Sequence, residues 1–206
     1  MKLNVPYQKT LVKWFGKGVC GPIALFQVLK YYKIKSSVDE LAELTNTHPK
    51  FGTPPHCLIY LAQKKGLKVE YVGLHEKYCN NRKGYSKSLK KYFNGMNSTK
   101  IDNLFLSKCK KLKGYTYIKK KPTIKVIENY LAQNKPVIAL IDWSYIGKIK
   151  NAEPHYITIT GTTKNNVIAH QIWPRKDKPF QKISKENYVK TWKAQGFKGN
   201  IIIAYK

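Results

Sequence analysis

The stretch that decides the fold reads Gly-Val-Cys-Gly-Pro-Ile-Ala-Leu at residues 18–25. From Leu25 onward, apolar residues recur at helical spacing, which predicts a helix over residues 21–32 with Pro22 in its first turn. Cys20 therefore comes directly before a helix N-terminus, where free backbone N–H groups and the helix dipole favour the thiolate. A cysteine with a lowered pKa is a typical enzyme nucleophile, so Cys20 is a candidate nucleophile. The plain alternative is a buried cysteine that ends a loop.

A histidine opens a predicted strand, His-Tyr-Ile-Thr-Ile-Thr-Gly at residues 155–161. Strand alternation places His155, Ile157 and Ile159 on one face. An imidazole fixed at the start of a strand can serve as a general base, although a lone histidine is more often a satisfied core residue. Upstream of the cysteine, Gln8 ends the stretch Asn-Val-Pro-Tyr-Gln. Its amide can donate to a developing oxyanion beside the backbone N–H of Cys20.

The remaining pattern predicts helices in the first half of the chain and strands in the second. A capping box from Ser37 to Glu40 predicts a short helix that ends near Leu44. Further helices are expected at residues 53–66, 101–111 and 123–133, and after the capping residue Ser184; strands are expected at 67–72, 136–141, 155–161, 167–172 and 199–205. This order is typical of an α+β fold with an antiparallel-leaning sheet.

Taken in order, the motifs resemble the papain-like peptidases of the bacteriocin-processing (double-glycine leader peptidase) group and their stand-alone relatives. The matching stretches are Val-Pro-Tyr-Gln at 5–8, Cys-Gly-Pro-Ile-Ala-Leu at 20–25, Gly-Thr at 52–53, Lys-Gly-Leu at 65–67, Gln-Asn-Lys-Pro-Val at 133–137 and the histidine strand at 155–161. The resemblance covers nearly the whole chain except residues 75–122. It implies one papain-like cysteine proteinase domain over residues 1–206, with a Lys-rich insertion at about 75–122. The N-terminal helical lobe would carry the nucleophile helix, and the C-terminal antiparallel sheet would carry the histidine.

The resemblance also implies a role for each candidate residue. Gln8 would form the oxyanion hole, Cys20 would attack a carbonyl carbon and His155 would activate the cysteine. These peptidases orient the histidine with an Asp or Asn after the next strand, and this chain has Gln171 at that position. A glutamine carbonyl can accept the imidazole Nδ1–H, but it is longer and carries no charge to stabilise an imidazolium. Asp177 is the alternative orienting residue if the register is shifted.

The charge of the chain bears on its partners. The formal net charge is +28, and Arg82 and Arg175 are the only arginines among 39 basic residues. Arginine is the usual residue for bidentate phosphate contacts, so a lysine-rich surface favours non-specific attraction to polyanions over specific recognition. The expected partner is a peptide or protein substrate. Neither a metal nor a cofactor is expected, because no metal-binding spacing occurs. Without a signal-like or membrane-spanning segment, we expect a cytoplasmic protein with reduced thiols.

Three functions stay open from the sequence. The first is a thiol hydrolase of peptide or related amide bonds, whose residues would equally support acyl transfer. The second is a catalytically weak or inactive papain-like protein that binds acidic peptides or nucleic acid. The third is a nucleic-acid-binding protein that uses aromatic residues of the middle region: Tyr85, Tyr92, Tyr115 and Tyr117. The alternative for these tyrosines is that they pack an inserted subdomain.

Overall fold

The computed structural model describes residues 1–11, 13, 18–45, 47–49, 52–77, 87, 98–148, 150–151, 153–171, 178–194 and 199–206. The helices are α1 (Cys20–Tyr31), α2 (Val38–Leu44), α3 (Pro55–Lys64), α5 (Ser98–Lys111), α6 (Ile124–Ala132), α7 (Ser144–Gly147) and α8 (Lys185–Thr191). The strands are β1 (Lys68–Gly73), β2 (Tyr115–Lys119), β3 (Val137–Asp142), β4 (Pro154–Thr162), β5 (Asn166–Gln171), β6 (Lys178–Ser184) and β7 (Asn200–Tyr205). Within these ranges, no helix is both long and apolar enough to span a bilayer.

One seven-stranded sheet runs through the molecule in the order β2-β1-β7-β3-β4-β5-β6. All neighbouring strands are antiparallel except β1 and β2, which are parallel. Parallel neighbours need a crossover connection, and α5 lies in the chain between these two strands. The structure is therefore α+β, with the antiparallel-leaning sheet that the sequence predicts.

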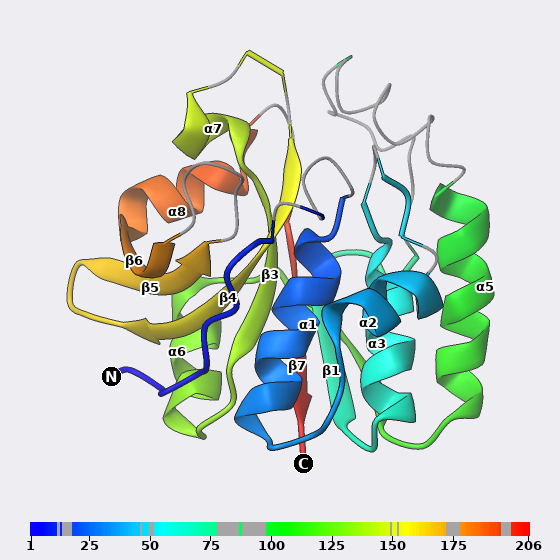
Figure 1. The fold of residues 1–206 in the computed structure, drawn as a ribbon. Helices are drawn as coiled ribbons and strands as arrows, with labels where there is room; N and C mark the ends of the chain where they lie inside the picture. Colours follow the sequence, from blue (N-terminus) through cyan, green and yellow to red (C-terminus); the bar gives the residue numbers. More distant parts are fainter. Residues whose placement is uncertain are drawn as a thin grey trace.

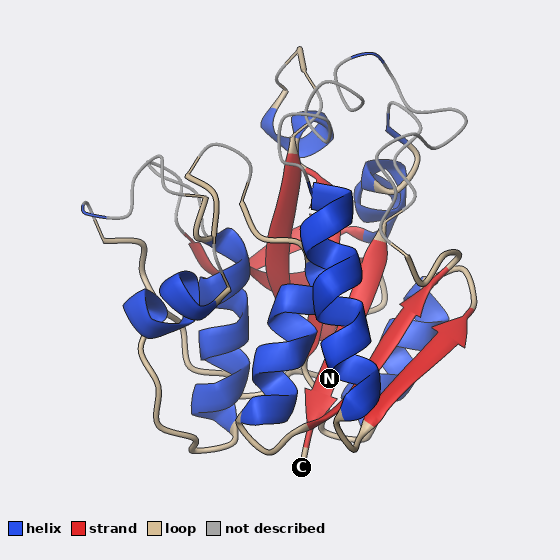
Figure 2. Ribbon diagram, turned by 90° about the vertical axis from the view of Figure 1, so that its right-hand side faces the viewer, coloured by secondary structure: helices blue, strands red, loops and turns tan. Residues whose placement is uncertain are grey.

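Helices cover both faces of the sheet and form two hydrophobic cores (Figures 1 and 2). The first core joins α1, α2 and α3 to one face of the central strands, and Ile202 and Ala204 of β7 point into it. The second core joins α6 and α8 to the other face, and Ile201 and Ile203 point into it. Because β7 is covered on both sides, its sequence is continuously apolar rather than alternating.

Local signals placed most elements correctly. The capping box at α2 is present: the Ser37 hydroxyl accepts from the Glu40 N–H, and the Glu40 carboxylate accepts from the Ser37 N–H. Thr123 and Ser184 cap α6 and α8 through their side chains. The sequence prediction lacked β2, β6 and α7. Both missed strands lie at the edges of the sheet, where few residues are buried and the apolar signal is weak.

Two tyrosines of the middle region serve packing. The Tyr115 hydroxyl donates to Glu76, the Tyr117 hydroxyl donates to the Gly73 carbonyl, and both rings pack on the first core. These contacts favour the packing alternative for this pair over a nucleic-acid surface. Tyr85 and Tyr92 lie outside the described residues.

The N-terminal segment runs along β4 toward the beginning of α1 (Figure 1). The Leu3 N–H donates to the Thr160 carbonyl at 2.7 Å, and the Thr162 N–H donates to the Met1 carbonyl at 2.9 Å. Gly161 lies between these bonds, and a β-carbon there would meet the Met1 carbonyl oxygen at 2.5 Å. The close approach explains why a glycine occurs within this buried strand.

Candidate active site

The turn before α1 fixes the position of Cys20. Gly18 has a positive φ of +64°, and a β-carbon there would lie 2.8 Å from the Gly52 backbone. Gly52 in turn pairs with His48 through two backbone hydrogen bonds. Only glycine fits this approach, so Cys20 becomes the first residue of α1 at a fixed distance from the loop that contains Gly52.

The start of α1 packs directly against the start of β4. A β-carbon on Gly21 would meet the Tyr156 ring at 3.3 Å. The Tyr156 backbone N–H also forms a hydrogen bond that favours the Cys20 thiolate. Burial is the largest influence and raises the pKa of the Cys20 thiol to about 11, although the N–H groups of Tyr156, Gly21 and Cys20 itself lower it. The lowered pKa expected from the helix N-terminus is therefore wrong for this state of the protein. Desolvation by the surrounding core outweighs the N–H groups.

His155 is the second residue of β4 and is held by the second core. It pairs with Ile141 of β3, its exposed fraction is 2%, and its ring centroid lies 5.5 Å from that of Trp143. Ile157 and Ile159 pack in the same core as Trp143, as the predicted alternation requires. Burial lowers the pKa of the His155 imidazole to about 4, so the ring is neutral at physiological pH.

Gln171 is the last residue of β5 and is completely buried. Alternation puts it on the same face of the sheet as Val167 and Ala169, which belong to the second core that also holds the His155 ring. Neither its Oε1 nor its Nε2 has a hydrogen-bond partner within the part of the chain that the structure describes. A buried amide in this condition has capacity for a polar neighbour. Asp177, the alternative orienting residue, lies outside the described residues.

Gln8 lies near the end of the N-terminal segment, which His170 holds through a hydrogen bond from its Nε2–H to the Val5 carbonyl at 2.8 Å. The Gln8 amide donates to the carbonyl of its own neighbour, Lys9, at 2.8 Å. The structure thus ties this side chain to the local backbone. A role toward an oxyanion at Cys20 requires a rotation of the Gln8 side chain.

Two carboxylates beside the candidate site were not among the sequence-predicted site residues. Asp142 ends β3, is fully buried, and accepts at Oδ1 from the N–H groups of Ser144 and Glu153. Burial, followed by the charge of Asp142, raises the pKa of Glu153 to about 7, and the charge of Glu153 contributes to the raised pKa of Cys20. Acidic residues are rare in this chain. The occurrence of two of them at the ends of adjacent strands was the sequence signal that could have identified them as site residues.

The thiol of Cys20 is expected to react with alkylating reagents slowly at neutral pH and faster with each rise in pH. With a pKa of about 11, the thiolate fraction at pH 7 is on the order of 10⁻⁴ and grows about tenfold per pH unit. Glu153→Gln removes a negative charge and should lower the Cys20 pKa. The variant should therefore label faster than wild type above about pH 8, where Glu153 is ionised, and equally fast below about pH 6, where Glu153 is protonated.

The measurement is iodoacetamide labelling across pH, with the modified residue located by peptide mass mapping. Glu43→Gln, an exposed substitution on α2, is the matched control and should label like wild type. A labelling midpoint at or below about pH 8.5 would contradict the burial argument and restore the helix-dipole prediction.

The family model described as the Peptidase_C39 like family matches residues 2–200. The solved peptidase domain of Streptococcus ComA, a bi-functional ABC transporter, is similar with a TM-score of 0.58 and 18% identity over 98% of this chain and 100% of that one. A putative C39-like peptidase from Bacillus anthracis has a TM-score of 0.58 and 14% identity over 100% of this chain and 98% of that one. A double-glycine motif protease from an AMS/PCAT transporter, solved with its leader peptide, has a TM-score of 0.51 and 13% identity over 100% and 94%.

No curated protein matches the sequence. The three structures share the arrangement of helices and sheet with this chain, which is the fold of the papain-like C39 peptidases. The family match extends over nearly all of the residues discussed above, including Gln8, Cys20, His155 and Gln171. The chain therefore belongs to the Peptidase_C39 like family.

Proposed function

We propose that the protein is a thiol peptidase that cleaves peptide or related amide bonds through an acyl-enzyme on Cys20. The observation that carries the proposal is the half-buried Cys20 at the N-terminus of α1, packed against the first residues of the strand that holds His155. Cys20 packs on the first core, and the His155 ring lies beside Trp143 of the second core.

The pKa directions define the resting state of a general-base mechanism, in which both groups start neutral. The thiol of Cys20 is protonated and the His155 imidazole is neutral at physiological pH, so the proton transfer runs from the thiol to the imidazole. As Sγ attacks the carbonyl carbon, its proton passes to His155 and then to the leaving amine. A water molecule next attacks the thioester and gives up its proton to His155, which releases the carboxylic acid and restores the thiol.

Two glutamines complete the proposed machinery. In the proposal, Gln8 turns its amide from the Lys9 carbonyl to the oxyanion, beside the N–H of Cys20. Gln171 orients the imidazole, since its fully buried amide oxygen is available to accept from Nδ1–H. Its lack of charge leaves the imidazolium less stabilised than a carboxylate would. We therefore expect a slow enzyme.

The substrate in this proposal is an unfolded or flexible peptide. A structural neighbour of this chain was solved with a leader peptide bound, which supports a peptide as the ligand of the shared fold. The residues Cys20 and His155 serve hydrolysis and transfer to an amine equally, because both begin with the same acyl-enzyme.

The test is incubation of the purified protein with a mixture of synthetic peptides, followed by mass spectrometry of both peptides and protein. We expect new peptide termini, together with an acylated Cys20 in acid-quenched samples. Adding a glycine ester separates the two chemistries, since a transferase joins the ester to the new C-terminus and a hydrolase does not. The absence of both cleavage and acylated Cys20 would contradict the proposal.

Three features favour a second function, a catalytically weak peptide-binding protein. The raised pKa of Cys20, the lowered pKa of His155 and an uncharged residue at position 171 all oppose formation of a thiolate–imidazolium pair. A protein of this kind would bind peptides in the assay above without producing new termini.

A further inference from the structure

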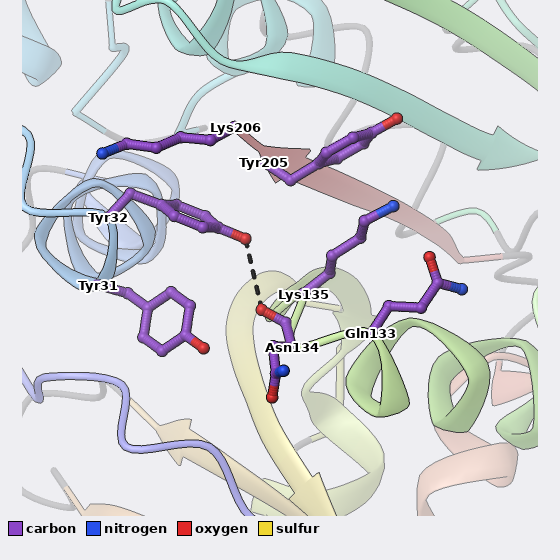
Figure 3. Close-up of a pocket in the computed structure, with 7 residues that line it drawn as sticks. All are labelled: Tyr31, Tyr32, Gln133, Asn134, Lys135, Tyr205 and Lys206. Carbon is purple, nitrogen blue, oxygen red and sulfur yellow. Dashed lines mark hydrogen bonds between the residues drawn. The ribbon is translucent and has the colours of Figure 1, made fainter.

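A second concave site lies at the end of the sheet remote from Cys20. It is an open pocket of about 470 Å³ between the last turn of α1, the turn that joins α6 to β3, and the end of β7. Figure 3 shows the side chains that line it, which come from these three segments. Because α1 spans 12 residues, the pocket lies about 17 Å from Cys20 along the helix axis. It is thus separate from the candidate active site.

Three tyrosine rings line the pocket, and ring contacts or hydrogen bonds hold each of them in place. Tyr31 and Tyr32 lie edge to face with their centroids 5.0 Å apart, and the Tyr32 hydroxyl donates to the Asn134 carbonyl at 3.5 Å. The Tyr205 hydroxyl donates to Glu70 at 2.7 Å, which fixes the ring of Tyr205 across the pocket. All three rings are only partly buried. Rings that are already ordered lose little conformational entropy when a flat ligand stacks on them.

The charge of the pocket is positive. Lys135 and Lys206 line it, and the Lys135 ammonium lies 3.7 Å from the centroid of the Tyr205 ring. No acidic side chain is among its described lining residues. The neighbouring carboxylate, Glu70, accepts hydrogen bonds from the hydroxyls of Tyr205 and Tyr130, which occupy both of its oxygens. An anion entering the pocket therefore meets ammonium groups, while the nearby carboxylate is already engaged.

We propose that this pocket binds a nucleotide unit, either free or within a single strand of nucleic acid. The base would stack on a tyrosine ring and the phosphate would pair with Lys135 or Lys206. Aromatic stacking and point-charge contacts to phosphate are the means by which single strands are bound without regard to sequence.

The test is fluorescence anisotropy of a labelled short oligothymidylate at about 0.15 M salt, where weak surface attraction is screened. Tyr32→Leu removes a ring without changing the charge and should weaken binding by about tenfold, because it removes one stacking partner of the base. Tyr145→Leu is the matched control, because Tyr145 is a 40% exposed tyrosine on α7. It should change the affinity less than about twofold. Equal affinity of the two variants would overturn the proposal, since attraction by net charge alone does not depend on the ring.

A pair of lysine variants gives an independent readout that does not depend on a packed ring. Lys135→Gln should weaken binding several-fold more than Lys113→Gln, an exposed substitution at another pocket on the surface. Identical losses would overturn the proposal, because both variants lose one charge. Competition with thymidine monophosphate then distinguishes the two sources of the ligand: displacement by the mononucleotide supports a free nucleotide, and displacement only by unlabelled strand supports a nucleic acid.

Discussion

Replacing Cys20 by alanine is expected to lower the rate of peptide cleavage at least about 10³-fold while leaving the melting temperature nearly unchanged. The reason is that the thiol is the proposed nucleophile, and loss of a nucleophile removes the covalent route altogether. The residue as a whole is partly exposed, so less packing is lost with its sulfur than at a fully buried position. The measurements are the initial rate on the best peptide found and a thermal melt followed by circular dichroism.

Cys57→Ala is the matched control for this experiment. Cys57 lies in α3, is fully buried, and burial raises its pKa well above the ordinary value. Removing its sulfur should cost about 1 kcal/mol and lower the melting temperature by roughly 2–4 °C, with the cleavage rate retained. If Cys20→Ala retained the wild-type rate, Cys20 would not be the nucleophile, whatever the result at Cys57.

Asp102→Ala should produce the largest loss of stability among single substitutions in the described part of the chain. His56 in α3 and Asp102 in α5 are both fully buried, and His56 Nδ1 lies 2.6 Å from Asp102 Oδ2. The His56 backbone N–H donates to Oδ1 of the same carboxylate at 2.9 Å, and Tyr115 lies 3.2 Å from the other ring nitrogen. Truncating one member leaves the other buried without its partner. Such a change costs about 3–5 kcal/mol, or roughly 6–20 °C in melting temperature.

The matched control is Asp39→Ala, which breaks the ion pair between Lys13 and Asp39. The exposed fractions of those side chains are 56% and 57%. Solvent screens such a pair, so the expected loss is below about 1 kcal/mol. Similar melting temperatures for the Asp102 and Asp39 variants would show that the buried pair does not hold α5 on α3. Asp102→Asn, which keeps the shape and one oxygen, is expected to fall between the two.

Much of the fold was predictable because its signals are local. The capping box at Ser37 and Glu40 and the apolar stripe that begins at Leu25 are each encoded within a few consecutive residues. The strands β3, β4 and β7 were predictable for a different reason. All three are buried on both faces. β3 and β7 are correspondingly apolar over most of their length, whereas β4 was predictable from its alternation of isoleucine and threonine.

The edges of the sheet were not predictable in this way. β2 and β6 have half-exposed faces. β6 also contains Pro179 and two lysines, a composition that is typical of loops. Its pairing with β5 and the parallel pairing of β2 with β1 depend on backbone groups of residues distant in sequence. No local propensity contains that information.

For the candidate site, the sequence by itself identified Gln8, Cys20, His155 and Gln171 as candidates, and it determined the position of the cysteine at a helix N-terminus. Only the tertiary structure decided the sign of the Cys20 pKa shift and the direction of the Gln8 amide. It also brought Glu153 close enough to Cys20 for its charge to raise the thiol pKa. It also decided the pairing of His56 with Asp102, which lie 46 residues apart. The physical reason is that a helix dipole is set by neighbours in the chain, whereas desolvation is set by everything that packs around a group.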